Sequence, residues 1–195
     1  MNFLGHAVLS FGDTELLTGN MIADHVKGRK AVEEFPAGIA KGIMLHRKID
    51  EFTDTHNATS RAKLLFRGDY GLYSGAIIDS LYDHFLANDP AYFPNQSALK
   101  DFARECYKKL DEKQQYLPST FANYFPYMKE QDWLSGYRNI KGMHRPLEAL
   151  QRRAKYMADP ALAYEIFIGH YYQLAQCYYD LMDDIVRYVK VELSH

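Results

Sequence analysis

Apolar residues recur three and four positions apart along almost the whole chain, and this spacing is the strongest constraint on its fold. It is typical of helices that bury one face, whereas a half-buried strand alternates apolar and polar residues. The chain shows no convincing alternation of that kind, no internal repeat and no low-complexity linker. Its 195 residues are enough for one well-buried core and too few to require two. We therefore expect one all-α domain over residues 1–195, an irregular helical bundle.

Capping residues, glycines and prolines predict where the helices begin and end. Asp13 can cap a helix over 14–28 that Gly28 ends, and Pro36 fits the first turn of a helix that continues to about Thr55. The other helices are expected over 60–67 up to Gly68, 70–89 before Pro90, 97–116, two shorter pieces near Pro118 and Pro126, 145–157 and 159–193.

Charge and targeting signals exclude several classes of function. The net charge of −2 argues against a general nucleic-acid binder, which usually carries a marked basic excess. The N-terminus has no basic segment of a signal peptide, and no apolar run approaches the roughly 18 residues of a membrane span. Cys106 and Cys177 are far apart and read as free thiols of a reducing compartment. A cytoplasmic protein without membrane insertion is expected; the sequence leaves its oligomeric state open.

The stretch GIMLHRKIDEFTDTH, residues 42–56, places His46, Asp50 and Asp54 four residues apart. On a helix this spacing forms a slowly drifting row on one face, so His46 and Asp50 can approach a common ion. Asp54 lies one further turn away. The alternative is an ordinary solvated helix face, and the spacing alone does not decide between the two.

Three other segments bring His or Asp into apolar helical surroundings. Asn20 and Asp24 form one pair four residues apart, and Asp79 and Asp83 form another. The remaining candidates are His84, which follows Asp83, and His6, which interrupts the apolar N-terminal segment. Burying carboxylates without a cation or a hydrogen-bond partner is costly, so these positions favour a shared site over separate core residues.

Facing helices that project carboxylates and imidazoles inward are typical of a metal site in a helical bundle. Such nitrogen and oxygen ligands suit Mn²⁺, Mg²⁺ or Fe²⁺ better than the thiolate-rich ligand sets of structural zinc sites do. An ion of this kind activates water and polarises phosphoryl oxygens, which makes hydrolysis the natural chemistry. Arg47, beside the row, is either a phosphate contact or a surface ion-pair partner.

Five blocks of the sequence together resemble the acyl carrier protein phosphodiesterases, also called ACP hydrolases. They are MNFLGHAVLS, LTGNMIADHVKG, GIMLHRKIDEFTD, SLYDHFLAND and FANYFPYMKEQDWLSGYRNI, in the order and spacing of that family from the first residue to about Ile140. The resemblance is looser beyond Ile140. Each block alone is a weak signal, and their combination is specific.

The resemblance implies an HD-domain-like helical fold, a manganese-type cofactor and release of 4'-phosphopantetheine from holo acyl carrier protein. The family is an irregular member of the HD group, and here the adjacent pairs Asp24-His25 and Asp83-His84 stand in the reverse order of a His-Asp dyad. Arg47 would steady the phosphate, and Asp54 or His84 would hold a ligand in place or move a proton. The implied ligands of one or two ions are His6, Asp24, His46, Asp50 and Asp83.

Acyl carrier proteins are strongly acidic, so a complementary basic rim is expected around the site. Its candidates are Lys27, Arg29, Lys30, Lys48, Arg61, Lys63 and Arg67. Two other functions stay open at this point. One is an HD-type phosphohydrolase that acts on nucleotides or other small phosphoesters, and the other is a non-catalytic helical binding module.

Overall fold

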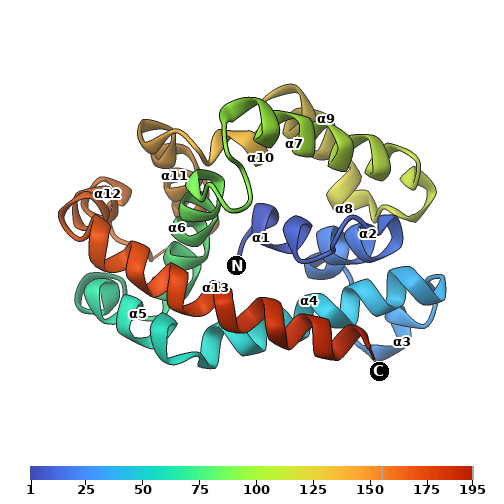
Figure 1. The fold of residues 1–195 in the computed structure, drawn as a ribbon, viewed down its shortest axis with the longest axis horizontal. Helices are drawn as coiled ribbons and strands as arrows, with labels where there is room; N and C mark the ends of the chain where they lie inside the picture. The colour runs from blue at the N-terminus through green and yellow to red at the C-terminus, as the bar shows by residue number, and fades with distance from the viewer. Residues whose placement is uncertain (155, 195) are drawn as a thin grey trace.

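The computed structural model describes residues 1–154 and 156–194, and every regular element in these residues is helical, which confirms the predicted all-α fold (Figure 1). None of the described helices is long and apolar enough to cross a membrane. The α-helices are α1 Phe3–Val8, α2 Thr14–Ile22, α3 Arg29–Val32, α4 Ala37–Thr55, α5 Asn57–Tyr70, α6 Ser74–Asn88, α7 Gln96–Asp111, α8 Ser119–Ala122, α9 Phe125–Glu130, α10 Trp133–Gly136, α11 His144–Arg153, α12 Pro160–Gly169 and α13 Tyr171–Leu193. Four 3-10 turns join them: η1 Ala23–His25, η2 Gly71–Tyr73, η3 Gln114–Tyr116 and η4 Ile140–Met143.

Helices α2 and α4 cross in backbone contact because glycines line the crossing. A Cβ atom on Gly19 would lie 2.2 Å from the carbonyl oxygen of Ile39, and one on Gly42 would lie 2.5 Å from that of Leu16. Neither position can hold a larger residue without moving a helix. On α4, Gly42 lies one turn before His46, so the close crossing carries the imidazole up to the backbone of α2.

Helix α1 is held by a side chain from α6. The buried Asp83 accepts hydrogen bonds from the backbone N–H groups of Asn2 at 3.2 Å, Leu4 at 2.7 Å and Gly5 at 3.1 Å. These groups belong to the first turn of a helix, where no intrahelical acceptor is available. Asp83 thus fixes α1 against α6, and the N-terminus lies in the middle of the molecule (Figure 1).

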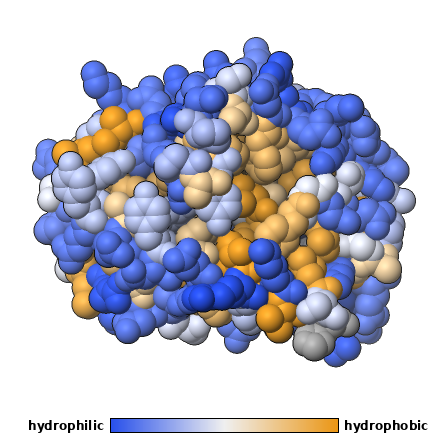
Figure 2. Space-filling model, in the orientation of Figure 1, coloured by the Kyte–Doolittle hydropathy of each residue, from blue (hydrophilic) through white to orange (hydrophobic). Residues whose placement is uncertain are grey.

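The long C-terminal helix α13 runs along α5 and then α4, and it closes one side of the bundle, while α7, α9 and α10 lie on the opposite side of α1 (Figure 1). The core includes fully buried Phe66, Tyr82, Phe121, Phe167 and Tyr178. Apolar residues gather toward the middle of the face in Figure 2, and hydrophilic residues form most of its border.

Several helix boundaries differ from the predicted ones. The helix expected over 14–28 ends at Ile22 and continues as the 3-10 turn η1, after which Val26 is extended. Gly68 does not end a helix, since α5 continues to Tyr70 and ends where Gly71 takes a positive φ of 52°. The helix expected over 159–193 is divided into α12 and α13 at Gly169–His170. The helix expected over 145–157 ends at Arg153, and Lys155 of that range lies outside the described residues.

Candidate metal centre

Asp50 and His46 form the part of the site that α4 supplies. The carboxylate oxygen Oδ2 of Asp50 lies 3.0 Å from Nε2 of His46, one helical turn earlier. Oδ1 of Asp24, in η1, lies 3.4 Å from the same nitrogen. The expected approach of His46 and Asp50 is therefore present, and the close crossing of α2 and α4 brings Asp24 to it.

Helix α1 supplies a second imidazole. Nε2 of His6 lies 3.1 Å from Oδ1 of Asp50 and 3.2 Å from the carbonyl oxygen of Met1. The rings of His6 and His46 stack with centroids 3.9 Å apart. Asp50 thus places one oxygen against each imidazole, and potential ligand atoms of His6, His46 and Asp50 all lie within 4.8 Å of one another.

The hydrogen bonding of His46 fits a cation in this group. Its Nδ1 lies 2.9 Å from the carbonyl oxygen of Asn20, which can only accept, so Nδ1 carries a hydrogen. In the neutral ring the lone pair is then on Nε2, which is buried and has no hydrogen-bond partner among the described residues. A lone pair that faces carboxylate oxygens is repelled by them unless a positive charge lies between. This is the donor arrangement of a metal-ligating histidine.

The pKa values show where the site favours positive charge. Burial, together with the neighbouring His46, lowers the pKa of His6 to about 4. Burial also lowers the pKa of His46, but the carboxylates of Asp24 and Asp50 outweigh it and raise the pKa to about 9. Burial raises the pKa of Asp50, but the two imidazoles reverse this effect and bring it well below its usual range. A proton or a metal ion can supply the charge that is favoured between His46 and the carboxylates.

Asp24 lies at the solvent side of the group, and Arg47, which follows His46 in α4, contacts the segment after Asp24. The side chain of Asp24 is 78% exposed, and the contact with His46 lowers its pKa. Arg47 donates from Nη2 to the carbonyl oxygen of Val26 at 2.9 Å, and it therefore holds the extended segment that follows η1. Its remaining guanidinium N–H groups leave it free to contact a phosphate as well.

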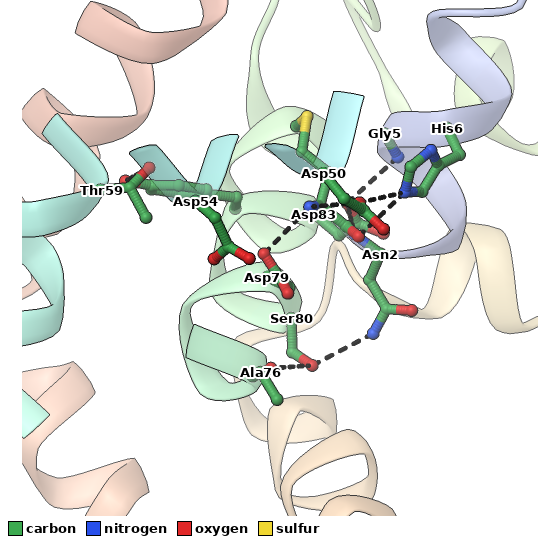
Figure 3. Close-up of polar contacts among 12 residues, drawn as sticks. Asn2, Gly5, His6, Asp50, Asp54, Thr59, Ala76, Asp79, Ser80 and Asp83 are labelled. Atoms are coloured by element: carbon green, nitrogen blue, oxygen red, sulfur yellow. Dashed lines mark hydrogen bonds and ion pairs between the residues drawn. The ribbon is translucent and has the colours of Figure 1, made fainter. Parts of the chain in front are cut away.

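The structure does not bring Asp83 into the group of His6, His46 and Asp50, because Asp83 caps the first turn of α1 instead. Burial raises its pKa to about 7, while the amino group of Met1 and the backbone N–H groups lower it. Figure 3 shows Asp83 close to Asp50 and Asp79 at the start of α1. Asp79 accepts a hydrogen bond from the Met1 amino group at 2.9 Å.

The two residues expected in supporting roles also lie elsewhere. Oδ1 of Asp54 lies 2.7 Å from Nζ of Lys63, and Figure 3 shows Asp54 beyond Asp79 on the side away from His6. His84 is buried among aromatic rings, with Nδ1 2.8 Å from the carbonyl oxygen of Tyr137 and Nε2 3.1 Å from the hydroxyl of Tyr171. Both of its ring nitrogens therefore have partners in the core.

The sequence analysis pairs Asn20 with Asp24 but gives it no specific role, and it does not name Ser10 or the carbonyl of Met1; all three contact the imidazoles or their partners. A signal was present for Asn20, a polar residue that follows a glycine in the apolar part of a helix. Nothing in the sequence indicates the Met1 carbonyl or Ser10, because a backbone group and a small hydroxyl become partners only through the fold.

Comparisons with known proteins find matches along most of the chain. The family model described as "Acyl carrier protein phosphodiesterase" matches residues 1–185. A relative of that name from Yersinia pestis is 32% identical over 183 residues, which are 94% of this chain and 91% of the relative. Relatives with the same name are 30% identical in Yersinia enterocolitica, over 92% of each chain, and 31% identical in Klebsiella pneumoniae, over 78% of this chain and 79% of the relative. No solved structure matches the chain.

Proposed function

Since the chain belongs to the acyl carrier protein phosphodiesterase family, and is in that sense a hydrolase, we propose that it removes 4'-phosphopantetheine from holo acyl carrier protein. The reaction would cleave the phosphodiester that joins the prosthetic group to a serine, and the apo protein with its free serine hydroxyl would be released. The distant relation to HD-domain phosphohydrolases is part of this proposal and follows from the family resemblance.

We propose further that the hydrolysis depends on a divalent metal, with Mn²⁺ favoured and Mg²⁺ or Fe²⁺ as alternatives. One observation carries this proposal: the buried Nε2 of His46 has no hydrogen-bond partner among the described residues and faces the carboxylates of Asp50 and Asp24. His6, His46 and Asp50 would hold the ion, and Asp24 would complete the set from the solvent side. When bound, such an ion polarises a phosphoryl oxygen and lowers the pKa of water.

The protein's own residues would position the substrate around these ligands. Arg47 is fixed by the Val26 carbonyl, so its guanidinium can hold a phosphate oxygen without losing much conformational freedom. Asp24, exposed at the edge of the site, is placed either to bind the ion or to accept a proton from the attacking water. Asp54, His84 and Asp83 have other partners, and we give them no direct contact with the phosphate.

The docking surface for the acidic carrier protein would include fewer basic residues than the seven expected from the sequence. Several of the candidate cations pair with acids of this chain: Lys48 with Glu192, Arg61 with Asp180, and Lys63 with Asp54. Lys27 and Lys30 follow shortly after Asp24 in the chain and are exposed, and the exposed Arg29 lies 3.8 Å from the carboxylate of Glu33. Charge complementarity therefore favours the segment 27–30 as the first contact.

The decisive experiment incubates the protein and holo acyl carrier protein with Mn²⁺, and with chelator instead of metal. Mass spectrometry is then used to look for loss of the phosphopantetheine group. We expect conversion to the apo form with Mn²⁺ only. Asp24→Asn should reduce the rate by at least about 100-fold and leave the helical circular dichroism unchanged, because its side chain is mostly exposed. Asp101→Asn on α7 is the matched control, an exposed carboxylate that pairs with the nearby Arg104.

The same assay separates the remaining functions. Conversion of free nucleotides but not of the carrier protein would favour a small-molecule phosphohydrolase of HD type. No stoichiometric Mn²⁺ binding and no conversion of either substrate would indicate a binding module and would refute the proposal. Full activity of Asp24→Asn would leave the reaction in place and would show that the site is assigned wrongly.

A further inference from the structure

Asn20 contacts both imidazoles of the candidate metal centre and is almost fully buried. Its side-chain oxygen Oδ1 lies 3.3 Å from Nδ1 of His6, and its main-chain oxygen lies 2.9 Å from Nδ1 of His46. Asn20, in α2, therefore contacts Nδ1 of each of two histidines. His6 comes from α1 and His46 from α4. Each of these histidines presents its other nitrogen, Nε2, to the carboxylate of Asp50.

The hydrogen bonds of Ser10 fix which way the Asn20 amide points. The Ser10 hydroxyl donates its only hydrogen to the carbonyl oxygen of His6 at 2.8 Å. At its 2.9 Å contact with Asn20, this hydroxyl oxygen must therefore accept, and the atom that donates to it is the amide nitrogen Nδ2. The amide oxygen of Asn20 is then the atom that faces His6. The orientation follows from the network, since oxygen and nitrogen of an amide differ only in what they can donate or accept.

The same reasoning extends to the protons on both imidazoles. An amide oxygen only accepts, so the contact with Asn20 requires the hydrogen of His6 on Nδ1, and the main-chain oxygen of Asn20 requires the same of His46. At Nε2 of His6 the Met1 carbonyl and the Asp50 carboxylate also accept, so Asn20 competes with them for the one hydrogen of the neutral ring. With the hydrogen on Nδ1 in both rings, the lone pair is left on Nε2, toward Asp50. We propose that Asn20 is a positioning residue that sets the tautomers of His6 and His46, through its side chain for one and its backbone for the other. The inference rests on the proposed function only where it concerns metal, because the tautomers are properties of the protein alone.

The two halves of this arrangement depend on different features of the sequence. The bond to His46 uses the backbone, and it needs the close crossing of α2 and α4 that Gly19 and Gly42 permit. The bond to His6 uses the side chain, and a residue without an acceptor at this position would leave Nδ1–H of His6 buried and unpaired. His6 would then gain a hydrogen bond by moving its hydrogen to Nε2, where Asp50 and the Met1 carbonyl accept it. A protonated Nε2 cannot bind a metal.

The test measures ring nitrogens in the metal-free protein by two-bond ¹H–¹⁵N correlation NMR at alkaline pH, above the pKa of about 9 that the neighbouring carboxylates give His46, so that both imidazoles are neutral. In the wild-type protein we expect the Nδ1–H pattern for both His6 and His46, assigned with the variants His6→Gln and His46→Gln. In Asn20→Leu, which has nearly the same shape, His6 should change to the Nε2–H pattern. His46 should keep its pattern because its acceptor is backbone, so it serves as an internal control.

Three further variants distinguish positioning from a general effect on packing. Asn20→Asp keeps an acceptor toward His6 and should restore the Nδ1–H pattern. Ser10→Ala removes the partner of the amide nitrogen and should give His6 a mixture of the two patterns. Thr18→Val, a buried position on the same helix whose hydroxyl donates to the Thr14 carbonyl, should leave both histidines unchanged. Ser10→Ala also decides the question if Asn20→Leu does not fold.

Metal affinity gives the second readout. We expect Mn²⁺, followed by its electron paramagnetic resonance signal, to bind Asn20→Leu about 10- to 100-fold more weakly than wild type, and Asn20→Asp to recover most of the loss. An unchanged His6 pattern in both Asn20→Leu and Ser10→Ala would overturn the inference. The predicted tautomers in a protein that binds no Mn²⁺ would support the inference and refute the metal part of the proposed function, so the two failures can be told apart.

Discussion

At the scale of single residues, the buried histidines of this protein serve two different purposes. His6 and His46 each have one ring nitrogen bonded to Asn20 and the other facing carboxylate oxygen. His84 has both ring nitrogens bonded to neutral groups of Tyr137 and Tyr171. The first arrangement leaves a nitrogen available to a cation, whereas the second satisfies the ring completely. The residue types are identical, and only the partners distinguish a ligand from a core residue.

His84 should make the protein sensitive to acid. Burial lowers its pKa below the ordinary value of 6.5, although the Tyr137 carbonyl partly opposes this effect. The unfolded chain then binds the proton more readily than the folded one. The stabilisation is therefore complete above about pH 6.5 and is lost as the pH falls through the folded pKa. Urea unfolding between roughly pH 8 and pH 5 should show a steeper loss of stability in wild type than in His84→Gln. Equal slopes would mean that His84 is not held neutral in the fold.

Asp83 gives a prediction that separates a helix cap from a metal ligand. Asp83→Ala leaves three backbone N–H groups of α1 without their acceptor, and we expect it to lower the free energy of unfolding by roughly 3 kcal/mol or more. Asp83→Asn keeps one oxygen and should cost less. Folded Asp83→Asn should bind Mn²⁺ within a few-fold of wild type, whereas Asp50→Asn should lose binding. Equal losses in the two variants would restore Asp83 as a ligand, as the sequence predicts.

At the scale of elements, the crossing of α2 and α4 decides the geometry of the site. Gly38, Gly42, His46 and Asp50 follow one another at intervals of four residues, so they share the face of α4 that turns toward α2 and α1. The glycines let the helix backbones touch, and the histidine and aspartate continue the same row into the metal centre. The residues that pack α4 against α2 and the candidate metal ligands of α4 therefore lie on the same face of this helix.

Gly42→Ala should therefore damage both stability and metal binding. The added methyl group would lie 2.5 Å from the Leu16 carbonyl oxygen and 2.9 Å from Cα of Gly19, so the helices must separate. We expect a loss of about 1–3 kcal/mol in the free energy of unfolding and weaker Mn²⁺ binding, because the bond from His46 to the Asn20 carbonyl lengthens. Gly68→Ala is the control. It lies in α5 with open space at its Cβ and should stabilise the protein by up to about 1 kcal/mol. Full Mn²⁺ affinity in Gly42→Ala would show that the crossing does not set the site.

At the scale of the whole molecule, charge is distributed so that few of the expected rim cations remain available to a partner. The net charge is only −2, and Lys48, Arg61 and Lys63 each pair with an acid. The exposed segment 27–30 follows Asp24 and precedes α3. An acidic protein that approaches the site would meet positive charge there first, and this effect acts on association more than on the chemical step.

The double variant Lys27→Glu/Lys30→Glu should consequently raise KM for holo acyl carrier protein several-fold at low salt and change kcat little. The difference from wild type should shrink at high salt, since the screening length falls from about 10 Å at 0.1 M to about 3 Å at 1 M. Lys100→Glu/Lys108→Glu on α7 changes the net charge by the same amount and is the control. An equal rise in KM for both pairs would mean that overall charge matters and that segment 27–30 is not a docking surface.

The sequence by itself determined the all-α fold, the boundaries of α4 and the end of α6 before Pro90. It also determined the approach of His46 and Asp50. These features depend on periodicity, capping and spacing within one segment, and such local properties can be predicted from the sequence directly. The family could be inferred as well, because several short blocks keep their order and spacing along most of the chain.

Only the tertiary structure decided which polar residues of different segments meet. It joined His6 of α1 to Asp50 of α4, and it turned Asp83 toward the backbone of α1. It also placed His84 in the aromatic core and brought Asn20 into contact with both imidazoles. The physical reason is that a hydrogen bond or a ligand contact requires positions correct to a fraction of an ångström. Helix crossings such as the one at Gly19 and Gly42 fix those positions, and the spacing within a single segment does not reveal them.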